Sequence, residues 1–321
     1  MQKNIQMILE QLEIEYKKEI PIGRITGMWQ VKILPLVAWP DSIDKLRKIS
    51  LFCLKNGIAF DTFGGLTNTY LCNSYSRELV ILTGKVRDKI DLNNGIITVG
   101  CGYNLTKLSK DLTNRGIDGY VGFVGIPGTV GGATINNSGA FRSEMKNVVV
   151  GCHIIDTQGL EKYVTNDDLQ YSPRHSILKG KRDFVLLSID IITANMMSVE
   201  KLEKELNMYI SVRKNKIDGK RKSLGSIFCS FTITEIMKRH PIAFFLKRLL
   251  NIPNKFLFHS SYYSTWLQFV LLGCPRLARH CDSINRFCWN KKTTEEDFFD
   301  YLKTMQKLAG GNLIYEIEIR R

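Results

Sequence analysis

Two glycine-containing stretches offer the clearest chemistry in this sequence. Residues 125–133 read GIPGTVGGA, and residues 64–68 read GGLTN. Glycine lets the backbone approach a ligand closely, and successive N–H groups at a helix start can bind a pyrophosphate. The candidate ligand-binding positions are Gly64, Gly65, Thr67, Asn68, Gly125, Pro127, Gly128, Thr129, Gly131, Gly132 and Ala133.

Either stretch alone also fits an ordinary tight turn. Two of them beside expected strands favour a dinucleotide, although the residue types do not say which one. The Gly-x-Gly-x-x-Gly motif of a Rossmann fold is absent, and no Gly-Lys-Ser/Thr of a phosphate-binding P-loop follows either stretch.

The elements that must position these stretches are a mixture of helices and strands. Capping residues and apolar spacing predict helices over residues 41–56, 104–116 and 198–213, and a further helix that opens with Thr293 and Glu296 as a capping box. Apolar runs and alternation predict strands over residues 58–63, 79–82, 96–99, 148–155, 184–192 and 313–319. Without a regular βαβ repeat, this mixture favours an α+β fold.

The charge balance points to anionic partners. The formal net charge is +14, and its densest cluster comprises Arg213, Lys214, Lys216, Lys220, Arg221 and Lys222. The cluster by itself also fits a solvated helix end and loop. No aromatic interleaving or nucleic-acid motif accompanies it, so we expect no nucleic-acid partner.

The cysteines predict reduced thiols and no metal site. None of the eight forms a Cys-x-x-Cys pair, and no secretory signal is visible. Cys274, Cys281 and Cys288 recur every seven residues beside His280, but zinc ligands usually come as close pairs.

The most apolar region, residues 242–270, is too interrupted to span a bilayer. Lys247, Arg248, Asn251, Pro253 and Lys255 break it. An amphipathic element that lies on a membrane surface remains an alternative for this region.

Longer stretches around the glycine motifs resemble one known family. Residues 125–141 (GIPGTVGGATINNSGAF), the preceding VGCGYNLTKLSKDLTNRGIDGYVGFVGIPG and the turn GGLTNTYL are similar to the flavin-binding segments of UDP-N-acetylenolpyruvoylglucosamine reductases. The resemblance covers about residues 45–195. It implies a two-lobed FAD-binding domain of the vanillyl-alcohol-oxidase (PCMH-like) type, followed by a C-terminal α+β substrate domain.

The resemblance also implies domain limits, a cofactor and a reaction. We expect an N-terminal helix over residues 1–19, the FAD-binding domain over 20–195 and the substrate domain over 200–321, with a basic loop at 215–225 near the boundary. NADPH would reduce the bound FAD. The FAD would be bound non-covalently, because residues 64–71 and 125–141 contain no His or Cys for attachment. The substrate would be an anionic UDP-sugar enolpyruvyl ether, converted in the cytoplasm to a peptidoglycan precursor.

Three residues stand at the family's catalytic positions. Arg174 lies in SPRHSIL, Ser226 in SLGSIF and Glu318 in YEIEIR. By the resemblance, Arg174 would bind the substrate carboxylate, Ser226 would donate a proton, and Glu318 would hold or orient the enolate. Taken singly, such residues are more often a surface ion pair, a turn and a solvated strand residue.

The sequence also departs from the family pattern. Pro173 replaces an aromatic residue, Cys229-Ser230 replaces Lys-Asn, and Ile284 stands where the family has a histidine. Residues 231–285 match poorly overall. Two alternatives therefore stay open: an oxidoreductase of the same fold that acts on another sugar nucleotide for surface polysaccharide, and a flavin-binding paralogue without turnover. The oligomeric state does not follow from the sequence.

Overall fold

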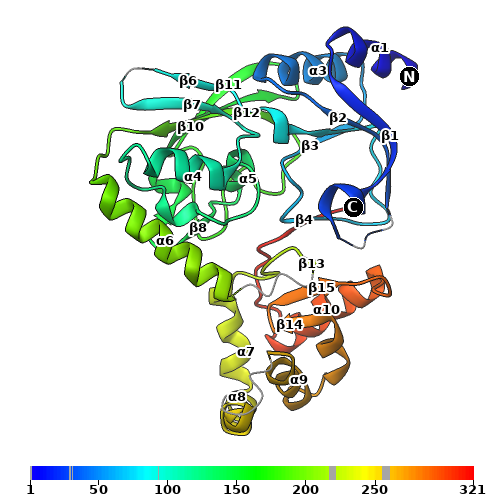
Figure 1. Cartoon of the computed structure of the whole chain (residues 1–321). Coiled ribbons are helices and arrows are strands. Elements are labelled where there is room, and N and C mark those ends of the chain that lie inside the picture. Colours follow the sequence, from blue (N-terminus) through cyan, green and yellow to red (C-terminus); the bar gives the residue numbers. More distant parts are fainter. Residues whose placement is uncertain (1, 29, 31, 93, 217–221, 255–260) are drawn as a thin grey trace. The chain divides into compact units, whose positions relative to one another are not determined.

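The computed structural model describes residues 2–28, 30, 32–92, 94–216, 222–254 and 261–321 (Figure 1). The chain forms two compact units that alternate along the sequence. The first unit comprises Met1–Pro21, Ile33–Thr67 and Ser76–Asp218, and the second comprises Ile22–Lys32, Asn68–Tyr75 and Gly219–Arg321. The three consecutive domains expected from the sequence stay a prediction.

The first unit holds two sheets. Its elements, with η for 3₁₀-helices, are α1 (Gln2–Gln11), β1 (Glu15–Pro21), β2 (Ile33–Trp39), α3 (Ile43–Lys55), β3 (Phe60–Phe63), β5 (Leu79–Leu82), η1 (Thr83–Lys85), β6 (Lys89–Asp91), β7 (Ile96–Gly100), α4 (Leu105–Thr113), η2 (Val121–Phe123), α5 (Val130–Ile135), β8 (Gly139–Ala140), β9 (Ser143–Glu144), η3 (Met145–Asn147), β10 (Val149–Asp156), β11 (Glu161–Thr165), β12 (Phe184–Ile192) and α6 (Val199–Lys216). One sheet has the order β1-β2-β5-β3, and the other has the order β11-β10-β12-β7-β6. The second sheet is antiparallel throughout, whereas β5 runs parallel to β2 and β3.

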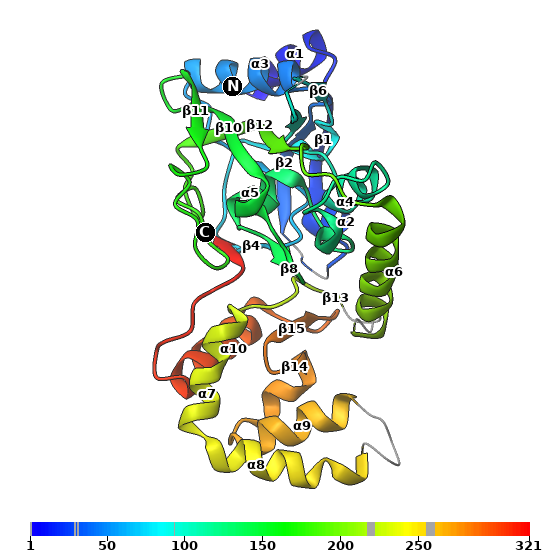
Figure 2. The same cartoon turned by 90° about the vertical axis from the view of Figure 1, so that its left-hand side faces the viewer.

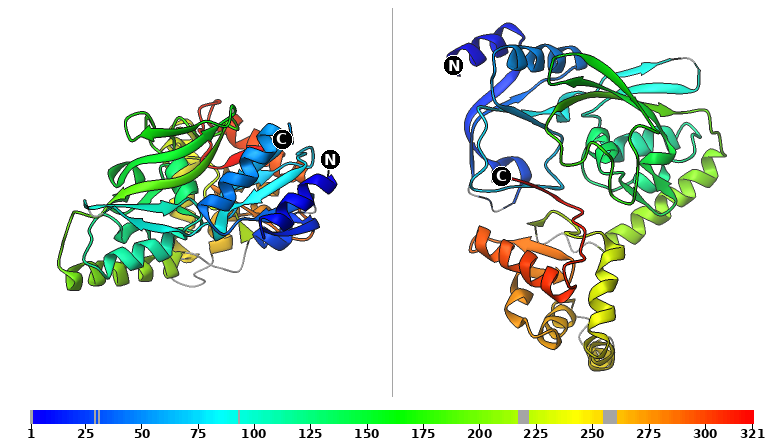
Figure 3. Two further views of the ribbon diagram at one scale, coloured as in Figure 1. Left: turned by 90° about the horizontal axis from the view of Figure 1, so that it is seen from above. Right: turned by 180° about the vertical axis from the view of Figure 1, so that it is seen from behind.

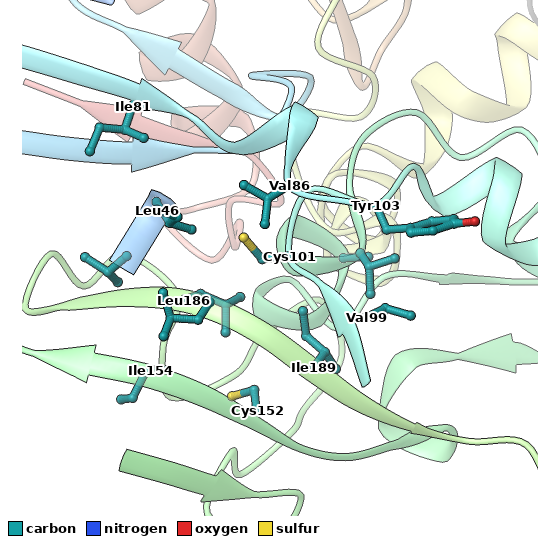
Figure 4. Packing of buried hydrophobic residues seen from close by; sticks show 14 of the residues in the cluster. Leu46, Ile81, Val86, Val99, Cys101, Tyr103, Cys152, Ile154, Leu186 and Ile189 are labelled. Carbon is teal, nitrogen blue, oxygen red and sulfur yellow. The ribbon is translucent and has the colours of Figure 1, made fainter. Parts of the chain in front are cut away.

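A single apolar core joins the two sheets of the first unit. Leu46 of α3, Ile81 of β5, Val99 of β7 and Leu186 of β12 all contribute side chains to it (Figure 4). Helix α3 packs against β12, so the blue helix lies beside the green strands in Figure 3. The predicted α+β class and two-lobed arrangement are therefore confirmed for this unit.

Local sequence signals set most of its elements. The Ser42 hydroxyl accepts a hydrogen bond from the Lys45 N–H, and the Asn104 side chain accepts one from the Lys107 N–H, so both predicted helix starts are confirmed. The strand predicted over 184–192 is β12. The helix expected over residues 1–19 ends early, because Glu15–Pro21 instead forms strand β1 and pairs with β2.

The second unit is built around an aromatic core. Its elements are α2 (Ile22–Thr26), β4 (Thr69–Leu71), β13 (Lys222–Ser223), η4 (Ser230–Ile233), α7 (Thr234–Arg239), α8 (Pro241–Leu250), α9 (Ser261–Leu271), η6 (Pro275–His280), β14 (Cys281–Ser283), β15 (Arg286–Trp289), α10 (Glu295–Leu308) and β16 (Glu318–Arg320). Strands β13, β15 and β14 form one small sheet, and β16 pairs in parallel with β4. Tyr70, Phe228, Phe287, Phe298 and Tyr301 fill the core.

Two predictions in the second unit are wrong in detail. The capping box is formed by Thr294 and Asp297 rather than by Thr293 and Glu296, because the Thr293 hydroxyl instead accepts from the Asn290 N–H. The strand predicted over 313–319 is reduced to β16. Ile317 is buried as expected, but Tyr315 is 36% exposed, so the alternation does not continue through the segment.

Three findings concern classes of site that the sequence raised. The eight cysteines are free thiols. Within the described ranges, no group of three or more His, Cys, Asp and Glu side chains is placed to hold a metal ion. No helix in the same part of the chain has both the length and the apolarity to cross a bilayer.

Candidate functional site

The two glycine stretches meet in the first unit. The Thr67 hydroxyl donates a hydrogen bond to the Pro127 carbonyl at 3.3 Å. A Cβ on Gly64 would collide with the Thr129 side chain, and a Cβ on Gly128 would lie 2.9 Å from the Thr67 Oγ1. The contact between the loops therefore needs glycine at both positions.

The start of α5 is held by the protein itself. The Val130 and Gly131 N–H groups donate to the carbonyls of Tyr103 and Cys101, each at 2.8 Å, and the Gly132 N–H donates to the Thr129 hydroxyl at 3.2 Å. These N–H groups already donate hydrogen bonds within the protein. The sequence instead predicted that the N–H groups at this helix start bind a pyrophosphate. A binding role for Gly131, Gly132 and the neighbouring Ala133 stays a prediction.

The turn after β3 has the open donors instead. Within the described residues, the N–H groups of Gly65, Leu66 and Thr67 donate no hydrogen bond. Leu66 has a positive φ of 51°, and Gly65 is exposed. Consecutive amides in such a turn form a concave anion-binding nest. This turn is suited to hold a phosphate group.

Arg174 lies on a tight turn that is hydrogen-bonded to residues at the end of α5 and just after it. Ser172 and His175 exchange backbone hydrogen bonds across the turn. The Asn137 side chain donates to the Ser172 carbonyl at 3.0 Å, and the buried Ser176 hydroxyl donates to the Ile135 carbonyl at 2.7 Å. Arg174 itself has a φ of 58°, which a non-glycine residue rarely adopts and which often marks a functional position.

Arg213, at the end of α6, is a candidate site residue that the sequence reasoning missed. Its guanidinium lies 5.6 Å from the Phe141 ring centroid, and Phe141 stacks on Tyr209 at 3.8 Å. A Cβ on Gly125 would lie 2.8 Å from the Arg213 Cδ. Burial lowers the pKa of Arg213, and the charge of Arg174 lowers it further.

Arg213 thus lies beside Gly125 of the glycine run, and its positive charge favours an anionic ligand group there. The sequence signal was only a basic cluster over residues 213–222, of which 217–221 lie outside the described residues. Nothing in the sequence set Arg213 apart from its neighbours.

Ser226 and Glu318 belong to the second unit. Ser226 is partly exposed and precedes Ile227, whose carbonyl accepts from the Glu316 N–H at 2.9 Å. The Asn285 side chain fixes the same segment by bonding to both backbone groups of Phe228. The Ser226 segment therefore lies against the chain just before Glu318, whereas Arg174 belongs to the first unit.

Asn68 organises this C-terminal segment. Its side-chain amide donates to the Glu316 carbonyl at 2.9 Å, and its own carbonyl accepts from the Glu318 N–H at 2.9 Å. The Glu318 side chain is 20% exposed, and its carboxylate forms an ion pair with Arg320. A carboxylate held by a guanidinium is suited to accept and orient hydrogen bonds.

Comparison with known proteins finds consistent likenesses to one family. Residues 34–162 match a family described as an FAD binding domain. UDP-N-acetylenolpyruvoylglucosamine reductase from Bacillus subtilis (strain 168) is 28% identical over 71% of this chain and 75% of its own length. The protein of the same name from Bacillus velezensis is 27% identical over 59% of this chain and 62% of its own length. The crystal structure of UDP-N-acetylenolpyruvylglucosamine reductase from Thermus caldophilus has a TM-score of 0.64 and 19% identity, and covers 96% of this chain and 99% of that chain.

These likenesses support the chain as a divergent relative of the UDP-N-acetylenolpyruvoylglucosamine reductases. The family resemblance and the fold class that the sequence predicts are confirmed. The matched domain is one that binds FAD. The match with the B. velezensis relative spans less than two thirds of that protein.

The residues of the first unit fit the flavin cofactor of this family. The glycine loops are in contact, and the turn at Gly65–Thr67 has amides that no described residue engages. A side chain at Gly64 or Gly128 would disrupt the contact between the loops. Pyrophosphate binding by Gly64, Gly65, Thr67, Gly128 and Thr129 stays a prediction that these contacts support.

The poorest match to the family, residues 231–285, coincides with helices α7 to α9. Cys229 is buried. Ile284 is partly buried and packs against the aromatic core of the second unit. Neither side chain supplies the charge or ring nitrogen of the family residue that it replaces. These two departures from the family pattern therefore lie in the second unit.

Proposed function

We propose that the protein catalyses the NADPH-dependent reduction of the enolpyruvyl ether of UDP-N-acetylglucosamine to UDP-N-acetylmuramate, a peptidoglycan precursor. The observation that carries the proposal is the contact between the two glycine loops in a chain that matches the FAD binding domain over residues 34–162. The names of the relatives supply the substrate.

The glycine loops around Gly64 and Gly128 would hold FAD, which would supply hydride transfer from NADPH to the substrate. The residues of this chain would then have three tasks. Arg174 would bind the substrate carboxylate and offset the charge that grows on it, and its strained turn would hold the guanidinium in place. Arg213 adds positive charge beside Arg174 and so raises the local preference for an anion.

Ser226 would complete the reduction by donating a proton to the carbon next to the carboxylate. The double bond thus gains one hydride and one proton, and NADP⁺ is released. A serine hydroxyl is a weak acid in water, so the transfer requires a fixed donor and a stabilised enolate. Glu318 would orient these groups as a carboxylate, since Arg320 pairs with it.

We place the reaction in the cytoplasm and expect the flavin to be bound non-covalently. The eight free thiols fit a reducing compartment. The basic residues near Arg213 suit a UDP-sugar, whose diphosphate is anionic.

A second candidate keeps FAD and changes the substrate. The buried Cys229 and the Ile284 position favour a different sugar nucleotide, because both lack the family's polar groups. Such a protein would serve surface polysaccharide synthesis.

An anaerobic two-step experiment tests these candidates. The FAD-loaded protein is mixed with NADPH and then with the enolpyruvyl UDP-sugar, while the flavin absorbance is recorded. Bleaching followed by return of colour supports the proposed reaction. Bleaching without return points to another substrate, and the absence of bleaching points to a flavin-binding protein without turnover.

A further inference from the structure

Helix α8 exposes an apolar stripe. Ile242, Phe245, Leu246 and Leu249 recur at the spacing of one helix face and are exposed, with Ile242 at 73% and Phe245 at 62%. The helix contains no buried residue. Phe244 and its neighbour Ala243 face the other way and pack against the aromatic core of the second unit. The exposed stripe is therefore additional to the face that holds α8 on its unit.

The neighbouring helix α9 exposes an aromatic stripe. Tyr262, Tyr263, Trp266 and Val270 share one face and are all exposed, whereas Phe269 is buried in the core. Helices α8 and α9 pack together, and both views show them side by side (Figures 1 and 2). Tyr and Trp are the residues that concentrate at membrane–water interfaces, because their rings are amphipathic.

The charged residues within the sequence of these helices and their flanking segments have one sign, although Lys238 and Arg279 pair with Glu235 and Asp297 outside that stretch. Residues 236–281 contain no Asp or Glu, although 31 of the 321 residues in the chain are acidic. The same stretch carries Lys238, Arg239, Lys247, Arg248, Lys255, Arg276 and Arg279, of which Lys255 lies outside the described residues. An apolar face bordered by cations is complementary to a bilayer with anionic head groups.

The alternatives fit these observations less well. A second copy of the chain would bring two cationic surfaces together at a cost in electrostatic free energy. A spanning helix needs roughly 20 apolar residues, whereas α8 has 10 residues in all, two of them charged. A protein partner would have to supply many acidic groups and an apolar surface together, whereas an anionic bilayer offers both.

We propose that α8 and α9 dock the protein reversibly on the surface of an anionic lipid bilayer. The apolar stripes enter the boundary between head groups and acyl chains, and the flanking Lys and Arg side chains contact the lipid phosphates. This inference does not depend on the proposed reaction.

The test measures how the full chain partitions onto vesicles. FAD-loaded protein is sedimented with vesicles of phosphatidylglycerol and phosphatidylcholine, and with vesicles of phosphatidylcholine alone. We expect binding to the anionic vesicles that weakens as salt is raised, because salt screens the charges. Trp266 insertion should shift the tryptophan emission to shorter wavelength, and Trp266→Phe should remove that shift.

Two variants separate the contributions. The double variant Phe245→Ser, Leu249→Ser should lower the partition coefficient at least about tenfold, because it removes apolar surface. Lys247→Gln, Arg248→Gln should lower it about fivefold per charge. The control Leu160→Ser, Met196→Ser changes two comparably exposed apolar side chains of the first unit, at 60% and 68%, and should leave binding unchanged.

Several outcomes would overturn the proposal. These are no sedimentation with anionic vesicles, equal binding to neutral vesicles, and binding that both α8 variants leave intact. A dimer that the Phe245→Ser, Leu249→Ser variant dissociates, without vesicle binding by the wild type, would instead assign the stripe to contact between copies. Since the test reads sedimentation and emission, it is independent of reductase activity.

Discussion

Gly128→Val tests whether the contact between the glycine loops holds the flavin. Gly128 has a φ of 118°, and a Cβ there would lie 2.9 Å from the Thr67 Oγ1. The backbone strain of a branched residue in this region is about 1–3 kcal/mol. Loss of the Thr67 hydrogen bond to Pro127 adds about 1 kcal/mol.

If the variant relieves this strain by moving the loop, FAD binding must restore the loop at the same cost. A total of about 2–4 kcal/mol corresponds to a roughly 30-fold to 1000-fold weaker Kd. Titration of the apoprotein with FAD, followed by quenching of flavin fluorescence, measures this change.

Gly57→Val is the matched control for this experiment. Gly57 also has a positive φ, 63°, but a Cβ there would meet nothing within 4 Å. The control should lower Tm through backbone strain and leave the Kd for FAD unchanged. A folded Gly128→Val protein with wild-type affinity for FAD would refute the reasoning, as would an equal loss of affinity in the control.

Three further predictions concern catalysis, attachment and pH. Ser226→Ala should leave flavin reduction by NADPH unchanged but slow reoxidation by substrate about 10²–10⁴-fold in stopped-flow absorbance, because the proton donor is lost; Ser223→Ala is the control, and an equal loss in both half-reactions would make Ser226 structural. Acid precipitation should release all the flavin colour, and colour retained in the pellet would contradict non-covalent binding. Arg142 donates to Asp118 and so holds the pKa of that carboxyl below its ordinary 3.8. The stabilisation is present above pH 3.8 and lost as the pH falls through the lower, folded-state pKa, so Asp118→Asn should lower Tm near pH 6 and the difference should vanish in acid.

Local signals in the sequence predicted much of the first unit. Ser42 and Asn104 cap their helices with side chains that reach only three residues along the chain, so no distant contact is needed. The strand β12 is a nearly continuous apolar run and was predicted to the residue. The glycine stretches and the family resemblance likewise depend on contiguous residues.

Other elements depended on partners that are distant in the sequence. Residues 15–21 form β1 because β2 offers a strand edge, although the preceding residues have helical spacing. The C-terminal strand shortens to β16 because only Glu318–Arg320 pairs with β4, nearly 250 residues earlier. The apolar stripe of α8 has the same local pattern as a buried helix face, so the sequence did not show that it is exposed.

The sequence alone identified the family resemblance and the two glycine loops. Glycine at fixed spacing reflects what the backbone conformation requires, so it can be read directly from contiguous residues. It also placed Arg174, Ser226 and Glu318 as candidates by their position within motifs. Only the tertiary structure decided that the two loops touch through Thr67 and Pro127, and that Arg213 lies against Gly125. These contacts join segments 60 to 88 residues apart in the sequence, and a residue's type does not specify which distant segment folding brings against it.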